Sequence, residues 1–466
     1  MVDIVTLGAV ELRDAYRKGE LSPVEVTEAV LARVDALEPT LRALYVYDPE
    51  GARAAARAAE QRWRAGRPLG PVDGIPLTLK ENIATRATPV PLGTAATELV
   101  PAPADAPAAA RLRESGGVVL GKTTMPDYGM LTSGLSSLHP CARNPWDPTR
   151  TPGGSSAGAA AAAAAGYGPL HVGTDIGGSI RLPAGWCGLV GLKPSFGRVP
   201  VHPPFPGRVA GPMTRDVADA ALLMEVLARP DERDHLSLPP AELPWGSPEL
   251  DVAGARIGLQ LEPGEGLAVE PEIRAAVVEA ARLLEKAGAV VEPVEPFVSR
   301  EMLDGLDRFW RTRALVEVAA LPAERRERIL PYIAEWIRGA EGLSGVDVYR
   351  GFAQLDALSV AALAACRPFD FVLSPVCPVG PPPAEWASPT NDPARPFEHI
   401  VFTVPYNMSG QPAVSINCGY TADGLPIGLQ IAGRRFDDVG VLRLAAAFEH
   451  LRPPPHPWPT YPPTRR

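Results

Sequence analysis

The hydrophobic pattern at the start of the chain predicts two helices. Residues 22–25, SPVE, combine a capping box with proline at the first helical position, which predicts a helix over residues 22–37. Residues 48–50, DPE, form a similar start and predict a second helix that ends near Gly66. We therefore expect the chain to begin with helices.

Strand patterns then alternate with a helical one. Residues 74–80, GIPLTLK, predict a short buried strand that ends in a lysine, and residues 118–121 predict the next strand. Between them, Asp105 is expected to cap a helix that continues to Glu114. Strand, helix and strand in this order predict a parallel crossover, and thus an α/β core.

The second half of the chain shows the same alternation around a mainly helical stretch at residues 300–366. The turn TADG at residues 421–424 joins the last two predicted strands. One α/β domain with a helical insertion accounts for this pattern. The elements predicted here are a strand, helix and strand at 255–261, 271–286 and 289–294, and strands at 371–376, 413–418 and 427–432.

Two segments depart from these patterns. Residues 229–250 are polar and rich in proline, which predicts a connection without regular structure. Residues 159–165 are seven consecutive alanines. Because alanine has the highest helix propensity, this run predicts a helix packed so closely that only methyl groups fit.

Composition narrows the class of protein. The 466-residue chain carries a net charge of −9, which argues against a nucleic acid or an anionic membrane as partner, because both attract a basic face. No stretch reaches the roughly 18 uninterrupted apolar residues of a membrane-spanning helix. The first residues include acids and lack the basic start and apolar run of a secretory signal, so we expect a cytoplasmic protein.

Cysteine and histidine usage excludes two further classes of site. The five cysteines are widely spaced and include no CxxC pair, which predicts neither a disulfide framework nor a cysteine zinc site. The seven histidines are scattered, without HxxxH or HxH spacing. We therefore expect no metal and no cofactor.

Two clusters of glycine and serine are the first candidates for chemistry, residues 152–158, PGGSSAG, and residues 173–181, GTDIGGSIR. Glycine lets a ligand approach the main chain, and consecutive N–H groups of such a loop can converge on one oxygen, as an oxyanion requires. A serine at the end of the run, Ser179, would lie beside those donors. A phosphate-binding loop and a plain tight turn are the alternatives.

Two better-known motifs do not fit these clusters. Residues 154–158 satisfy GxSxG, but this nucleophile elbow follows a strand, and residues 144–152 contain three prolines. The elbow also needs a partnered histidine, for which only His399 and His450 lie late enough in the chain. The phosphate-loop pattern GxxxxGK[ST] is absent from both clusters.

Three longer motifs carry a resemblance to a known family. Residues 143–200 resemble the signature segment of the amidase signature family, residues 74–82, GIPLTLKEN, resemble its lysine motif, and residues 407–433 resemble its terminal sheet segment. The similarity extends from about residue 5 to residue 450.

The resemblance implies the architecture. We expect a single α/β domain over residues 1–466, with a central, mixed, twisted β-sheet covered by helices on both faces. A signature core would lie at about 70–220, a helical insertion at about 298–366 and a C-terminal sheet segment at about 370–450.

The resemblance also implies three catalytic residues, with Ser179 as the nucleophile, Ser155 as a bridging serine and Lys80 as the base. The 24-residue interval between the two serines matches the family spacing and selects Ser155 over Ser156. In the family the peptide bond before the bridging serine is cis, which here is the bond from Gly154 to Ser155.

The chemistry of these groups suggests how they work together. A serine hydroxyl is a weak nucleophile until a base removes its proton, and a lysine is such a base only when neutral. Burial at the end of an apolar strand would lower the pKa of Lys80. We hypothesise that Lys80 accepts a proton through Ser155 as Ser179 attacks a carbonyl. The oxyanion would be held by the N–H groups of Ile176, Gly177, Gly178 and Ser179.

Residues around the triad are expected to contact the substrate. Residues 125–133 correspond to the family's pocket wall, where Gly129, Met130 and Ser133 are candidate contacts for the acyl side. Residues 201–206 are idiosyncratic, and we expect them, with residues 300–350, to shape the leaving-group pocket.

Three nearby residues are expected to have structural roles. Asp175 and Arg181 flank the nucleophile loop and are predicted to brace it by hydrogen bonds. Cys187 is predicted to be a packed thiol, because no activating base is evident beside it.

Three functions remain open. The first is a free-standing amidase, a monomer or homodimer, that cleaves small-molecule amides, carbamates (as a urethanase does) or esters. The second is the catalytic A-type subunit of a glutamyl-tRNA amidotransferase. The third is a scaffold that has kept the fold without activity, against which the three intact catalytic positions argue.

Overall fold

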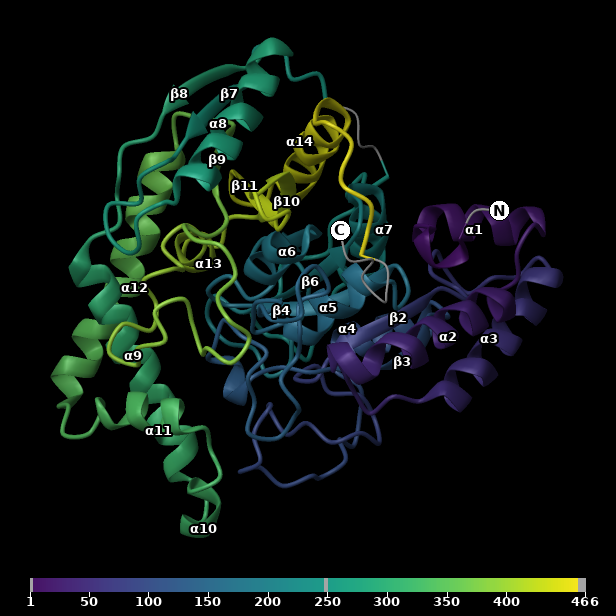
Figure 1. The fold of residues 1–466 in the computed structure, drawn as a ribbon, viewed down its shortest axis with the longest axis horizontal. Helices are drawn as coiled ribbons and strands as arrows, with labels where there is room; N and C mark the ends of the chain where they lie inside the picture. The colour runs from purple at the N-terminus through teal and green to yellow at the C-terminus, as the bar shows by residue number, and fades with distance from the viewer. Residues whose placement is uncertain (1–2, 247–249, 460–466) are drawn as a thin grey trace.

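Within residues 3–246 and 250–459, which the computed structural model describes, eleven strands form one mixed β-sheet through the centre of the molecule (Figure 1). Their order along the sheet is β1-β3-β2-β4-β6-β5-β10-β11-β9-β7-β8. The strands are β1 (Leu44–Tyr45), β2 (Pro76–Lys80), β3 (Val118–Thr123), β4 (Leu170–Asp175), β5 (Val190–Lys193), β6 (Val209–Thr214), β7 (Arg256–Leu259), β8 (Val290–Pro293), β9 (Phe371–Pro375), β10 (Ala413–Tyr420) and β11 (Pro426–Gly433).

Helices cover both faces of this sheet, as the resemblance implied (Figure 1). Short 3₁₀ helices occupy Ile4–Thr6 and Asp127–Gly129. The α-helices are α1 (Ala9–Lys18), α2 (Pro23–Leu41), α3 (Pro49–Arg64), α4 (Pro107–Glu114), α5 (Ala157–Ala165), α6 (Arg181–Cys187), α7 (Val217–Leu227), α8 (Pro271–Lys286), α9 (Arg300–Ala319), α10 (Ala323–Arg326), α11 (Pro331–Arg338), α12 (Gly345–Cys366), α13 (Val404–Met408) and α14 (Asp438–Leu451).

The two faces of the sheet belong to different hydrophobic clusters. On strand β6, Ala210 packs into the cluster formed with α1, α4, α7, α8 and α14. Met213, three residues later and on the opposite face, packs into the cluster formed with α5 and α6. Because successive side chains of a strand alternate between faces, the central strands are buried on both sides.

The register of the parallel strands positions the functional residues. Strand β2 pairs with β4 in parallel, with Leu77 opposite Leu170 and Leu79 opposite Val172. The carboxyl ends of parallel strands meet at one edge of a sheet, which is where ligands bind in open α/β folds. The lysine at the end of β2 and the glycine-rich loop after β4 therefore meet there.

The run of alanines forms a helix, as predicted, and every residue of α5 is buried. The helix begins so close to its neighbours that a Cβ atom on Gly158 would lie 2.2 Å from the carbonyl oxygen of Ala43. It would also lie 2.5 Å from the backbone nitrogen of Thr124. Close packing thus explains why this segment contains only alanine and glycine.

Gly158→Ala is expected to destabilise the protein by about 1–3 kcal/mol, the usual cost of an overpacked core. Urea unfolding followed by circular dichroism measures the change. Gly345→Ala, also in the first turn of a helix, is the matched control, because a Cβ atom there meets nothing within 4 Å. Equal loss of stability in both variants would contradict the packing explanation.

Helices α9–α12 make residues 300–366 mainly helical, as predicted, and they lie together at the left of Figure 1. Helix α9 packs along α12, and its Leu306 and Trp310 enter a third hydrophobic cluster with Trp336 and Phe402. No helix in the described ranges is long and apolar enough to cross a membrane. This third cluster adjoins the edge of the sheet where the site forms.

The structure corrects one predicted helix start. Asp105 does not cap α4, whose N-cap is Ala106, and its carboxylate instead accepts a hydrogen bond from the backbone of Arg86 at 2.7 Å. The described part of the predicted connection, residues 229–246 and 250, has no helix or strand, and residues 247–249 lie outside the described residues. The turn at 421–424 joins β10 to β11 as an antiparallel hairpin, as predicted.

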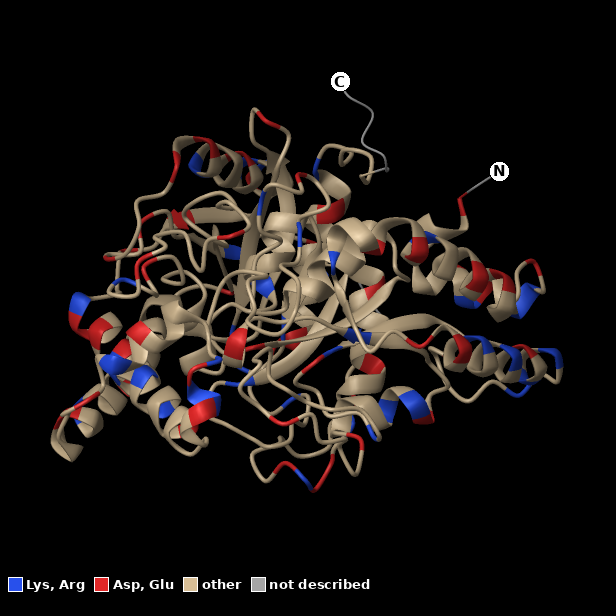
Figure 2. Cartoon of the chain, turned by 60° about the horizontal axis from the view of Figure 1, so that its bottom comes forward, with Lys and Arg blue, Asp and Glu red and all other residues tan. Residues whose placement is uncertain are grey.

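Charged side chains are rare near the centre of the fold. Figure 2 shows acidic and basic residues interspersed along the outer helices, while most of the central ribbon carries neither. Buried charges therefore stand out, and Lys80, Asp175 and Arg181 are among them.

Candidate active site

Lys80 lies at the end of β2 with its side chain fully buried. Its Nζ lies 2.8 Å from Ser155 Oγ and 3.4 Å from the carbonyl oxygen of Thr174. The lysine therefore reaches the serine that the spacing selected, which lies just ahead of α5.

The environment of Lys80 favours its neutral form. Burial lowers its pKa from 10.5 to about 7, although the nearby Asp175 carboxylate opposes this, and the Arg208 guanidinium lowers it further. A substantial fraction of this amine is thus uncharged at neutral pH. An uncharged amine can accept a proton from the hydroxyl beside it.

Two other lysines are buried in the described structure, and geometry separates them from Lys80. Burial lowers the pKa of Lys193 to about 7 and that of Lys122 to about 8. The Nζ of Lys193 donates to the carbonyl oxygen of Pro194 at 2.8 Å, and that of Lys122 donates to the carbonyl oxygen of Ile83. Neither contacts a serine hydroxyl, so of these three lysines only Lys80 is placed to accept a proton from one.

Ser155 is held by close backbone packing ahead of α5. The peptide bond from Gly154 to Ser155 is cis, as the resemblance implied. A Cβ atom on Gly154 would lie 2.5 Å from the backbone nitrogen of Ser133, and one on Gly129 would lie 3.2 Å from Ser155 Oγ. Glycine is therefore required on both sides of the hydroxyl.

Ser179 ends the glycine-rich loop that follows β4. It lines the same pocket as Ser155, a space of about 670 Å³ open to solvent. Its side chain is partly exposed, and its hydroxyl has no hydrogen-bond partner in the described part of the chain. The two serines thus share one pocket, with the lysine behind the first and a ligand-accessible space beside the second.

The loop offers main-chain donors to this pocket, with one qualification to the predicted set. The N–H of Gly178 donates to Asp175 Oδ1 at 2.7 Å, so it points at that carboxylate. The N–H groups of Ile176, Gly177 and Ser179 have no acceptor among the described residues, and all three residues line the pocket. These three groups are the available oxyanion donors.

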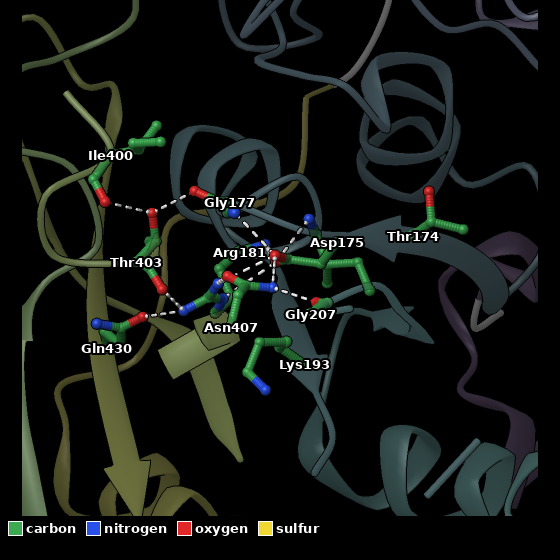
Figure 3. Close-up of polar contacts among 12 residues, drawn as sticks. Thr174, Asp175, Gly177, Arg181, Lys193, Gly207, Ile400, Thr403, Asn407 and Gln430 are labelled. Carbon is green, nitrogen blue, oxygen red and sulfur yellow. Dashed lines mark hydrogen bonds and ion pairs between the residues drawn. The ribbon is translucent and has the colours of Figure 1, made fainter. Parts of the chain in front are cut away.

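A buried ion pair braces the loop, as predicted (Figure 3). Arg181 and Asp175 are both fully buried and pair through two 3.0 Å contacts. The remaining guanidinium N–H groups donate to the carbonyl oxygen of Thr403 and to the side chains of Gln430 and Asn407. All five donors of Arg181 are therefore satisfied, and they tie the loop to the C-terminal segment.

The C-terminal segment also contacts the loop directly. Thr403 Oγ1 donates to the carbonyl oxygen of Gly177 at 2.6 Å, and Asn407 Nδ2 donates to Asp175 Oδ1 at 2.9 Å (Figure 3). Burial raises the pKa of the Asp175 carboxyl, but the charge of Arg181 and the hydrogen bonds from Arg181, Asn407 and the Ile180 backbone together outweigh it and hold that pKa well below its usual range. The carboxylate stays ionised and acts as a fixed acceptor.

The predicted substrate contacts are only partly brought together. Gly129 and Met130 line the pocket. Ser133 is fully buried and does not line it; its hydroxyl accepts a hydrogen bond from the backbone of Leu135 at 3.1 Å. Thr132, one residue earlier, lies on the pocket wall instead.

Other reactive side chains are not part of this site. Cys187 is fully buried, and burial raises the pKa of its thiol well above the ordinary value, as expected for a packed thiol. Among the residues that the structure describes, no three or more His, Cys, Asp or Glu side chains are grouped to hold a metal ion.

Sequence reasoning did not find several residues of the site. Arg208, Phe397 and two residues of α9, Trp310 and Arg313, line the pocket. The α9 residues lie within the segment 300–350 that was expected to shape the pocket, but nothing local marks any of the four individually. Gln430 could have been noticed, because it is a polar residue inside the apolar strand β11 and is fully buried.

Comparison with known proteins gives the family. The family model Amidase matches residues 25–442. The A-type subunit of the glutamyl-tRNA(Gln) amidotransferase of Myxococcus xanthus (strain DK1622) is 37% identical, over 96% of this chain and 98% of that protein. An acylamidase of Rhodococcus erythropolis is 36% identical over 96% of each chain.

The architecture agrees with solved structures. A bacterial aryl acylamidase of the amidase signature enzymes superposes with a TM-score of 0.88 at 30% identity, over 96% of each chain. This chain therefore belongs to the amidase signature family and is a hydrolase that acts on carbon–nitrogen bonds other than peptide bonds.

Proposed function

We propose that this chain is a free-standing amidase that hydrolyses small-molecule amides through an acyl-enzyme on Ser179. One observation carries the proposal: Lys80 Nζ lies 2.8 Å from Ser155 Oγ, in the wall of the pocket that also exposes Ser179. A buried neutral amine behind one serine and a solvent-accessible second serine are the parts that a relayed proton transfer needs.

The steps follow from this arrangement. Ser179 Oγ attacks the amide carbonyl carbon, its proton passes to Ser155, and the proton of Ser155 passes to Lys80. The carbon–nitrogen bond then breaks, Ser155 returns a proton to the leaving nitrogen, and Lys80 reprotonates Ser155. Water attacks the acyl-enzyme by the same relay, and the carboxylic acid leaves as Ser179 regains its proton.

Main-chain groups beside Ser179 can stabilise the negative charge that develops on the carbonyl oxygen of the substrate. The N–H groups of Ile176, Gly177 and Ser179 are the available donors for the oxyanion, and removal of one such donor typically costs about 2.7–4 kcal/mol of transition-state stabilisation. An ester differs from an amide only in its leaving group, and a carbamate presents the same kind of carbonyl carbon with an alkoxy substituent, so the same route accepts both.

The rate of anilide hydrolysis is expected to rise with pH around neutrality. Lys80 must be neutral to accept a proton, and its pKa of about 7 means that protonation removes the base as the pH falls below that value. We expect kcat/KM for an uncharged anilide to increase through an apparent pKa near 7, by about tenfold per pH unit below it. A profile that is flat between pH 5.5 and 9 would contradict the role of Lys80.

A second function is supported by a specific observation. The similarity to the A-type chain of a glutamyl-tRNA(Gln) amidotransferase covers 96% of this chain, so a catalytic subunit of such a complex is the alternative. Relatives of both kinds are similar to this chain over nearly its whole length, so membership of the family does not discriminate between them.

The two functions differ in what the isolated chain can do. We would purify the chain, determine its size by size-exclusion chromatography, and assay glutamine together with primary amides, anilides, carbamates and p-nitrophenyl esters. Turnover of anilides by the isolated monomer or homodimer is the expected result. Glutaminase activity that appears only with added partner subunits would favour the amidotransferase instead.

A further inference from the structure

Two arginines line the pocket from the segments in which sequence reasoning placed the leaving-group side. Arg208 lies between the loop 201–206 and the first residue of β6, and Arg313 lies on α9. Both also line a second, adjoining space of about 1220 Å³. The residues that border both spaces are Asn82, Tyr128, Thr174, Arg208 and Arg313.

The two guanidinium groups are gathered at this boundary by one aromatic ring. Arg313 Cζ lies 4.7 Å and Arg208 Cζ 5.4 Å from the centroid of the Phe205 ring. The loop that carries Arg208 is anchored by Asn407, whose Nδ2 donates to the carbonyl oxygen of Gly207 at 3.1 Å (Figure 3). The pair is thus held in place ahead of any ligand.

Most hydrogen-bond donors of this pair have no acceptor among residues 3–246 and 250–459. Of five guanidinium N–H groups, Arg208 uses one, in a 3.4 Å bond to the carbonyl oxygen of Pro203. Within the described residues the polar contacts of the Arg313 guanidinium are with Glu317, at 3.3 Å from Nε, and with the sulfur of Met130 at 3.9 Å. Arg181, the structural arginine of the site, has all five donors satisfied, so the contrast marks a binding role.

The local charge also favours an anion. Burial lowers the pKa of Arg208 to about 10, and the Arg313 charge lowers it further, while Glu317 opposes this. Glu317 is thus the acidic group that faces both cations, and its side chain is 40% exposed. Asp175 contributes little, because Arg181 neutralises it. Two cations against one carboxylate leave a positive site.

We infer that Arg208 and Arg313 bind a carboxylate of the substrate, so that the preferred substrates are amides that carry a carboxylate beside the scissile bond. Guanidinium groups match carboxylates in geometry and charge. The second space would hold an adjoining apolar part of the substrate, because most of its lining is apolar. The apolar side chains that line it include Ile83, Val90, Leu92, Met125 and Val201. This inference rests on the proposed function for its chemistry, but not for its binding.

Matched substrates test the inference. The acyl-side arm uses anilides of malonic, succinic, glutaric and adipic acid that keep one free carboxylate, and the amine-side arm uses 3- and 4-acetamidobenzoate. Each acid is compared with its neutral methyl ester. In one of the two arms we expect kcat/KM to be at least tenfold higher for the acid than for its ester, mainly because KM is lower. The arm that shows this preference identifies whether the carboxylate lies on the acyl side or on the amine side of the amide.

Variants show whether the two arginines cause the preference. Arg208→Met and Arg313→Met should each lower the acid-to-ester ratio at least tenfold, and Arg313→Lys should restore part of it. Glu317→Gln should raise the ratio, because it removes the competing carboxylate. Arg57→Met, at an exposed position on α3, is the matched control and should leave the ratio unchanged.

Binding measurements separate this inference from the proposed function. Calorimetry with Ser179→Ala protein compares the affinity of the same acids and esters without turnover, and tighter binding of an acid is expected. Hydrolysis of anilides with acid-to-ester ratios near one would overturn the inference and leave the proposed function standing. If no anilide were hydrolysed but an acid still bound more tightly than its ester, only the proposed function would be overturned. If every acid bound no more tightly than its ester, or nothing bound, the inference would be overturned.

Discussion

Replacement of Lys80 by methionine should lower kcat/KM for an uncharged anilide by at least about a thousandfold, the range expected when a catalytic base is lost. The fold should persist, because methionine fills a similar volume and no longer needs to bury an amine. Steady-state kinetics and thermal unfolding of the same protein preparation measure the two quantities.

Lys122→Met is the matched control for this prediction. Lys122 is also a buried lysine at the end of a strand, and burial lowers its pKa to about 8, but its amine donates to a main-chain carbonyl. Its loss should change turnover by only a small factor. If Lys80→Met folded normally and retained wild-type kcat/KM, Lys80 would not be the base.

Arg181→Met should destabilise the protein by about 3–5 kcal/mol, because it leaves the fully buried carboxylate of Asp175 without its cation. Turnover should also fall, since the same guanidinium ties the nucleophile loop to Thr403 and Gln430. Urea unfolding measures the first effect, and kcat at a temperature well below the transition measures the second.

An exposed ion pair provides the comparison. Arg282 lies 3.6 Å from Glu279, with both side chains more than half exposed to solvent, so Arg282→Met should change stability by less than about 1 kcal/mol. Similar small effects at both arginines would mean that the buried network does not hold the loop.

The catalytic motifs could be recognised from the sequence because the residues of each motif are consecutive in the chain. The lysine follows an apolar strand directly, and the two serines lie in glycine clusters a fixed interval apart. Because β2 and β4 are parallel neighbours, Lys80 lies beside Thr174 at the start of the nucleophile loop, and Ser155 reaches the same amine from the segment ahead of α5. The strand patterns at 74–80 and 118–121 predicted the parallel pair of β2 and β3, but not the adjacency of β2 and β4, because β4 was not predicted as a strand.

Three central strands escaped the pattern of hydrophobic residues. Strands β4, β5 and β6, with the sequences LHVGTD, VGLK and VAGPMT, contain glycine, proline or polar residues that resemble turns. They are strands because helices cover both of their faces, and glycine allows close approach: a Cβ atom on Gly173 would lie 2.8 Å from Ser156 Oγ. Tertiary packing decides their conformation, and local propensity does not show it.

The direction of the Gly178 N–H and the pairing of two arginines were also missed, because both depend on contacts that form only in the folded protein. The sequence predicted Gly178 as an oxyanion donor, but its N–H is directed to Asp175, which only the folded loop reveals. Arg208 and Arg313 lie more than a hundred residues apart and meet over Phe205. Residues 201–206 and 300–350 were expected to shape the pocket, and the structure identifies which side chains in and beside them do so.

Site-specific labelling tests the central claim most directly. A fluorophosphonate reacts with a serine only where a base and an oxyanion site activate it. The labelled protein would be digested and the modified residue identified by mass spectrometry, with the labelling rate compared between wild type and Lys80→Met. The account predicts modification of Ser179 alone, at a rate that falls at least a hundredfold without the lysine; modification of another residue, or an unchanged rate in the variant, would contradict it.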